Sequence, residues 1–172
     1  MTDRAADEYA ALRATIRERG TARVYVFALG LAVWAALALA SVVLAVPPVA
    51  TLIPLVVLAA TFEGVYGLHV AVERIGRYLL VFHEDRWEQD AGVFGNPTGA
   101  PKLDPLFATV FLLAALVNLV PVLATTPIVQ ELVIVGAAHA AFVARVLRAK
   151  AAARRQRGVD TERFRQLRQE NP

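Results

Sequence analysis

The chain of 172 residues has no cysteine, only two lysines among its 18 basic residues, and little charge of either sign. Without cysteine, disulfides, thiolate metal sites, iron–sulfur clusters and cysteine nucleophiles are all excluded. Charged residues make up 19% and apolar residues 57% of the sequence, whereas soluble domains average about a quarter charged and half apolar. The composition therefore disfavours a soluble enzyme, a disordered chain and a secreted scaffold.

Charge is missing above all from two long blocks. No Lys, Arg, Asp or Glu lies between Val24 and Phe62, and only Glu131 lies between Leu106 and Ala144. About 20 apolar residues suffice for a helix to cross the hydrocarbon core of a bilayer. Prolines and charges divide the blocks into predicted spans at residues 24–46, 49–72, 105–122 and 127–147. The sequence therefore predicts an all-α integral membrane four-helix bundle of two transmembrane hairpins, with short cytoplasmic amphipathic helices.

Turn and cap residues set the predicted ends of the helices. Pro47 and Pro48 end the first span, and the pairs Asp104-Pro105 and Thr126-Pro127 are typical of a cap followed by the first helical residue. In the tail, Gly158 predicts a helix stop, after which Asp160 or Thr161 caps a short further helix.

Three segments outside the spans complete the predicted organisation. Residues 1–23 form an arm in which Tyr9, Leu12 and Ile16 recur at helical spacing, as in an amphipathic helix. Residues 73–104 form a loop, and turn-forming residues crowd its part from 90 onward. Residues 148–172 form a basic tail.

The basic residues predict the orientation. Five lie in the arm, four in the central loop and its flanks and nine from Arg145 to the end of the tail, while the two hairpin turns have none. Cytoplasmic segments of membrane proteins are rich in Lys and Arg. Both termini and the central loop are therefore predicted to be cytoplasmic, with the 24–147 domain in a bacterial inner membrane; the excess of Arg over Lys beside abundant Ala is typical of a GC-rich bacterial genome.

One alternative concerns the first span. Ala38-Leu39-Ala40 before Ser41 resembles a signal-peptidase site, and cleavage there would leave three crossings. The preceding arm is long and contains acidic residues, unlike a short basic signal region, so the sequence favours an uncleaved first helix.

Glu63 is the sharpest candidate for a functional residue. It lies ~14 Å inside the predicted cytoplasmic end of the second span, where a carboxylate should face the bundle, be paired or be protonated. One interpretation is a proton or cation site. The other is a structural Glu held by a neighbouring helix, with Asn118 of the third span at comparable depth as the candidate partner.

His69 and His139 lie near the cytoplasmic ends of the second and fourth spans, and they could approach each other at that level. With Glu63 they would make a proton relay or a metal pair. However, Glu63 and His69 do not share a helix face, and no ligand spacing occurs on one helix. The sequence favours histidines that hydrogen-bond between helices, with no metal and no cofactor.

Other residues predict packing and surface contacts. A stripe of small residues on the second span predicts close helix approach: Ala60, Gly64, Gly67 and Ala71. Glu73 and Arg77 form an i,i+4 pair, followed by Tyr78 and Trp87 at the expected headgroup level. The basic tail residues Arg154, Arg155 and Arg157 are candidates for binding anionic lipid headgroups. Stacking aromatics are scarce beside them, so nucleic acid is not an expected partner.

Two stretches resemble a group of small bacterial inner-membrane proteins of unassigned activity. The first is Glu8-Tyr9-Ala10-Ala11-Leu12-Arg13 with Ile16-Arg17 before the first span. The second runs from Leu68-His69 through Glu73 to Tyr78, with Phe82-His83-Glu84 and Trp87-Glu88 after it. The resemblance implies an inner-membrane protein and supplies no catalytic residue.

These observations lead to one functional hypothesis and one alternative. The hypothesis is a non-enzymatic membrane module whose partners are the bilayer and either further copies of itself or a larger membrane complex. The alternative is a small proton- or cation-linked transporter or pore that uses Glu63. An enzyme is disfavoured because the soluble segments are too short for a catalytic domain.

Overall fold

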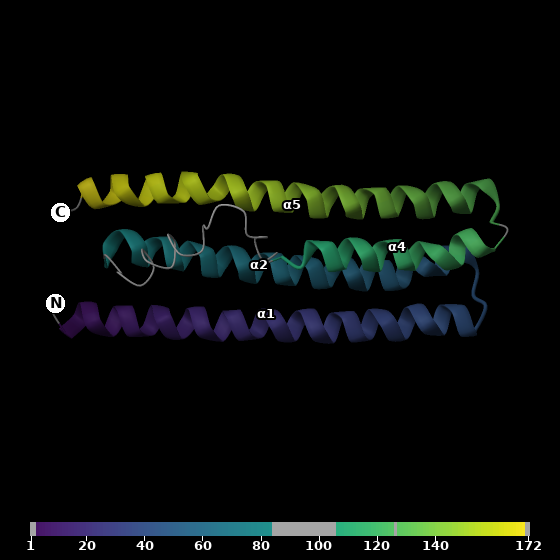
Figure 1. The fold of residues 1–172 in the computed structure, drawn as a ribbon, viewed down its shortest axis with the longest axis horizontal. Coiled ribbons are helices and arrows are strands. Elements are labelled where there is room, and N and C mark those ends of the chain that lie inside the picture. Colours follow the sequence, from purple (N-terminus) through teal and green to yellow (C-terminus); the bar gives the residue numbers. More distant parts are fainter. Residues whose placement is uncertain (1–2, 84–105, 126, 171–172) are drawn as a thin grey trace, which may run out of the picture. The chain divides into compact units, whose positions relative to one another are not determined.

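In a computed structural model, residues 3–83, 106–125 and 127–170 are described (Figure 1). Within these ranges the fold is all-helical and contains no strand, which confirms the predicted all-α class. The helices are α1 (Asp3–Val43), α2 (Leu52–Phe82), α4 (Ala108–Ala124) and α5 (Val129–Glu170), with the short 3-10 helix η1 (Pro48–Thr51) before α2.

Three of the helices are long and apolar enough to cross a membrane: α1, α2 together with η1, and α5. Helix α4 is equally apolar in character but has 17 residues. At 1.5 Å per residue its length is about 25 Å, slightly less than a typical hydrocarbon core. These lengths and compositions are those of a transmembrane protein.

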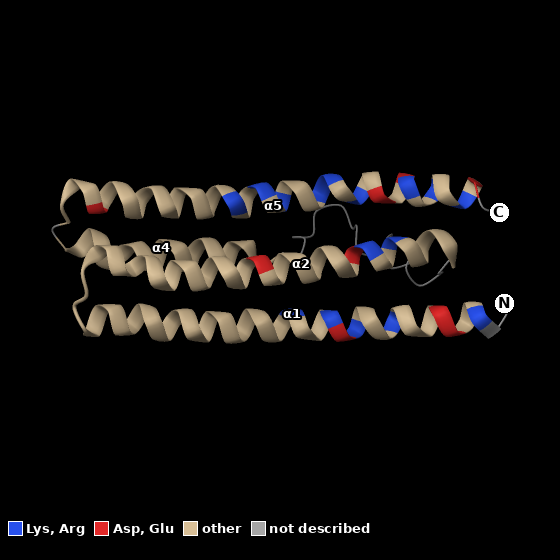
Figure 2. Cartoon of the chain, turned by 180° about the vertical axis from the view of Figure 1, so that it is seen from behind, with Lys and Arg blue, Asp and Glu red and all other residues tan. Residues whose placement is uncertain are grey.

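The chain divides into two compact units, each built from segments of the same long helices. The apolar unit comprises Arg23–Tyr66 and Asp104–Lys150, and the charged unit comprises Met1–Ala22, Gly67–Leu103 and Ala151–Pro172. Figure 2 shows that most Lys, Arg, Asp and Glu residues of the described helices lie in segments of the charged unit.

Aromatic side chains from all four helices form the core of the apolar unit. Phe62 of α2 is fully buried and contacts Phe111 of α4 and Phe142 of α5 edge-on, with ring centroids 5.2 and 6.3 Å apart. Phe27 of α1 stacks on Phe107 at 4.1 Å and meets Phe111 at 5.8 Å. Edge-to-face and offset contacts are favourable arrangements for aromatic rings, so this cluster holds the helices together.

Large apolar side chains also cover the outside of the apolar unit. Leu29, Leu116 and Val129 are 69%, 62% and 73% exposed, and no residue in the most apolar 18-residue window of α1 is buried. An apolar surface this extensive is costly in water and is typical of a protein that contacts lipid.

Helices α1 and α2 approach closely at Gly30, which the sequence analysis did not single out. A Cβ atom at Gly30 would overlap the side chain of Thr61, so only glycine fits there. Of the predicted stripe, Gly64 lies beside Val26, since a Cβ would be 3.1 Å from Val26 Cγ1, whereas Ala60 and Gly67 are exposed.

Several predicted helix ends are wrong. The arm and the first span form one continuous helix, α1, which ends at Val43 before the prolines; α2 continues past residue 72 to Phe82. The tail helix does not stop at Gly158, because α5 runs unbroken to Glu170. Asp160 does not cap a helix there; it lies in the interior of α5.

The two predicted caps at Asp104-Pro105 and Thr126-Pro127 involve Asp104, Pro105 and Thr126, which lie outside the described residues, as does Trp87. Helix α4 begins later than predicted, at Ala108, after Phe107 in the left-handed conformation (φ 50°) and without a side-chain cap. At the start of α5, Glu131 Oε2 accepts a hydrogen bond from the Ile128 N–H at 3.3 Å. Glu131 thus satisfies a free backbone donor at the start of α5.

Candidate functional site

A buried amide links the helices of the apolar unit. Asn118 of α4 is 2% exposed, and its Nδ2 donates to Thr51 O at 3.0 Å and approaches His139 Nε2 of α5 at 3.2 Å. Its Oδ1 accepts from Trp34 Nε1 of α1 at 3.4 Å. The three residues and Asn118 form what we call the Asn118 hub. One side chain thus ties α1, η1, α4 and α5 together.

The contacts of the hub indicate the tautomer of His139. Its Nδ1 lies 2.8 Å from Val135 O, which can only accept, so Nδ1 is the donor. Nε2 is then the acceptor for the Asn118 amide. Both ring nitrogens of His139 are therefore engaged in contacts of the bundle.

An apolar cavity of about 280 Å³ lies beside the hub in the apolar unit. Trp34, Ser41, Thr51 and Asn118 contribute the polar atoms of its wall, and each already makes a hydrogen bond. The remaining wall is apolar, from α1, α2 and α4. Such a cavity suits an apolar occupant and offers little for positioning a polar substrate.

Glu63 forms an ion pair, which is one of the three arrangements expected from the sequence. Its partner, however, is Arg145 and not Asn118. Glu63 Oε2 accepts a hydrogen bond from Arg145 Nη2 of α5 at 2.7 Å, and the Arg145 guanidinium lies 5.0 Å from the centre of the Tyr66 ring. The two side chains are 47% and 42% exposed. Glu63 therefore lies on the outside of its unit, level with Arg145 of α5.

The two predicted histidines lie in different units. His139 belongs to the apolar unit, and His69, which is 3% exposed, belongs to the charged unit with Ala71. In the ranges that the structure describes, no group of three His, Asp or Glu side chains is arranged to hold a metal ion. The residues Trp34 and Thr51 of the hub were not predicted, although Trp34 is the one tryptophan of the first apolar block.

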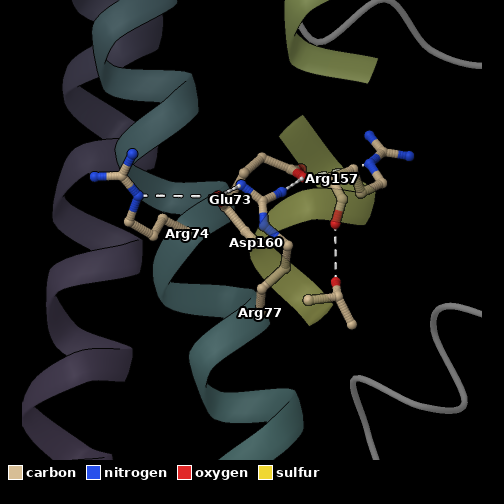
Figure 3. Close-up of polar contacts among 6 residues, drawn as sticks. Glu73, Arg74, Arg77, Arg157 and Asp160 are labelled. Carbon is tan, nitrogen blue, oxygen red and sulfur yellow. Dashed lines mark hydrogen bonds and ion pairs between the residues drawn. The ribbon is translucent and has the colours of Figure 1, made fainter. Parts of the chain in front are cut away.

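A network of charged side chains joins α2 to α5 in the charged unit (Figure 3). Arg77 is 8% exposed; its Nη1 donates to Glu73 Oε2 at 3.0 Å, as predicted, and its Nη2 to Asp160 Oδ2 at 2.9 Å. Arg74 Nε lies 3.9 Å from Asp160, and Arg157 Nε lies 3.6 Å from Glu73. Buried charges are stable only when paired, and here one arginine is held by two carboxylates from two helices.

An aromatic cluster lies further along the same unit. The Tyr78 ring stacks on Phe82 at 4.6 Å and meets Phe164 of α5 edge-on at 5.7 Å, while its hydroxyl donates to Glu8 Oε1 of α1 at 2.8 Å. Burial raises the pKa of Tyr78 above its ordinary value near 10, and the hydrogen bond to Glu8 and the negative charge of Glu8 raise it further. These contacts join α1, α2 and α5.

The three arginines predicted to bind lipid headgroups differ in their surroundings. Arg154 and Arg155 are exposed, whereas Arg157 is partly committed to Glu73. That these arginines bind lipid headgroups stays a prediction.

Comparison of the chain with protein-family models, curated proteins and solved structures finds no match. The resemblance to small bacterial inner-membrane proteins therefore stays a prediction.

Proposed function

We propose that this protein is a non-enzymatic, four-span module of a bacterial inner membrane, with both ends in the cytoplasm, that assembles with further copies of itself or with a membrane complex. Support comes from three long apolar helices, from their exposed apolar side chains and from the absence of Lys and Arg in both predicted outer turns.

The Asn118 hub is the observation that carries the non-enzymatic part of the proposal. An intramembrane site for chemistry needs polar groups that are free to meet a substrate. In the hub, the amide of Asn118 and both ring nitrogens of His139 are engaged in contacts between or within helices. These residues hold the bundle together, which is the common use of amides between transmembrane helices.

The charged unit is the part suited to a partner in the cytoplasm. Its α5 segment carries exposed charged residues, among them Arg154, Arg155 and Arg163, while the ion pair of Asp160 with Arg77 fixes it to α2. A helical platform with a stable interior and a charged surface fits docking better than catalysis.

The proposal is tested by the mass and the partners of the protein. Purified in mild detergent at native expression, it is expected to run as an oligomer or to carry other membrane chains with it. A monomer of 18.6 kDa without bound partners would contradict the proposal.

Transport is the second candidate, because the Glu63 side chain is half-exposed and titratable. Its pairing with Arg145 speaks against it, since a transported cation would have to displace the guanidinium. Proton and cation flux into proteoliposomes, compared between the native chain, Glu63→Gln and the control Glu131→Gln, separates the two functions. We expect no flux in any of the three; flux that only Glu63→Gln abolishes would establish transport.

A further inference from the structure

One outer face of the apolar unit carries an ion pair between two helices. On α2, Val56, Ala60 and Glu63 follow one another at spacings of four and three, and all are exposed. On α5, the exposed Ala141 lies one turn from Arg145 and on the same side of the helix. The Glu63–Arg145 ion pair joins the two helices at this face, which we call the α2/α5 face.

The ion pair is incomplete within one chain. Arg145 has five N–H donors, and Glu63 takes a hydrogen bond from Nη2 alone. Nearly half of each side chain remains exposed.

The level of the pair along the helices makes this exposure costly in a membrane. Arg145 lies about 24 Å of helix from Val129, less than the ~30 Å of a hydrocarbon core. On α2, Gly64 follows Glu63 and lies beside Val26 of α1. Val26 lies three residues after Arg23, the last charged residue before the first apolar block. The pair thus lies just inside the charged boundary, where acyl chains cannot satisfy the remaining donors and acceptors.

We propose that a second copy of this chain covers the α2/α5 face, related by a two-fold axis, so that Glu63 of each copy meets Arg145 of the other. This inference rests on the proposed membrane assembly and names its interface. A two-fold axis places the same surface patch of two copies against each other. When the patch holds one acidic and one basic residue side by side, the acid of each copy then faces the base of the other. The small residues Ala60 and Ala141 allow the close approach that helix association in lipid requires.

The other outer faces lack these properties. Leu113, Leu116 and Val120 of α4 are bulky, apolar and exposed, as are Leu29 and Leu39 of α1. Lipid chains satisfy such side chains fully, so no partner is needed there.

Charge exchange between copies tests the contact directly. In Glu63→Arg chains a homodimer would bring four guanidiniums together, and in Arg145→Glu chains four carboxylates. We expect each variant alone to lose at least about tenfold in dimer affinity, and a mixture of the two, carrying different tags, to form the mixed dimer. The proposal would be overturned if the mixed dimer were no tighter than either homodimer. That result is also the one expected if only lipid headgroups cover the ion pair.

Disulfide crosslinking in membranes locates the interface. Because the native chain has no cysteine, Ala60→Cys introduces a single thiol on the α2/α5 face, and Leu116→Cys introduces a matched thiol on α4. Oxidation is expected to link Ala60→Cys chains into dimers and to leave Leu116→Cys chains unlinked. Linkage at Leu116→Cys alone would overturn this interface while leaving self-assembly intact, whereas no linkage at either position together with a monomeric mass would overturn both.

Discussion

Single polar residues define which helices contact one another in the apolar unit. Asn118 and His139 were predicted to be polar contacts between helices, and both are; the identity of their partners was not predictable. Asn118 bonds to Trp34, 84 residues away, and to Thr51, 67 residues away. The position of a side chain along its helix follows from the sequence. The neighbouring helix that it contacts depends on how the helices pack in the folded chain.

Replacing Asn118 with Leu should destabilise the protein by about 1–3 kcal/mol, because Thr51 O and His139 Nε2 would be left buried without their donor. The free energy of unfolding in detergent measures the change. Val117→Leu, at an exposed neighbouring position, is the control and should change stability little. Equal stability of the two variants would contradict the structural role of Asn118.

At Tyr78, the raised pKa predicts a pH dependence at high pH. The folded state favours the protonated phenol, so this contribution to stability is complete below pH 10 and is lost as the pH rises through the higher pKa of the folded state. Glu8→Gln removes the negative charge and should lower the pKa of Tyr78 toward 10. Ultraviolet difference titration, with Tyr78→Phe to isolate the signal, measures the shift. The exposed control Asp7→Asn should leave it unchanged, and an equal shift there would refute the role of Glu8.

Among the helices of the described residues, composition predicted the all-α class, but local signals failed at several helix ends. Apolar blocks without charge require helices in lipid because every backbone group must be bonded, which is why the all-α fold was predictable. Gly158 resembles a stop signal in the sequence, yet α5 passes through it. The ion pair of Arg157 with Glu73 before that glycine, and the contacts of Asp160 with Arg77 and of Phe164 with Tyr78 after it, hold α5 against α2. Tertiary contacts thus override a weak local preference.

Gly158→Ala discriminates between a stop and a helix interior. In a helix with open space at the Cβ position, alanine should raise stability by up to about 1 kcal/mol; in a left-handed stop it would lower it. Thermal unfolding measures the sign. Gly136→Ala, at another open position of α5, is the matched reference and should also stabilise. Destabilisation at Gly158 alone would show that α5 is not continuous there.

The whole molecule comprises an apolar unit, whose exposed side chains suit lipid, and a charged unit. The sequence predicted the apolar blocks and the basic flanks. It did not predict that the arm, the start of the loop and the tail form one unit, because Arg77 and Asp160 are 83 residues apart and neither residue indicates its partner. Glu63 also proved to pair with Arg145 and not with Asn118, because the packing of α2 against α5 sets its partner.

Cysteine labelling from outside the cell tests the central claim most directly, since the cysteine-free chain needs no background substitutions. Leu44→Cys places a thiol beyond the end of α1, and Gln169→Cys places one near the end of α5. A membrane-impermeant maleimide should label Leu44→Cys in intact cells and Gln169→Cys only after the membrane is permeabilised. Labelling of Gln169→Cys in intact cells would contradict an even number of crossings and, with it, the proposed placement of every charged residue.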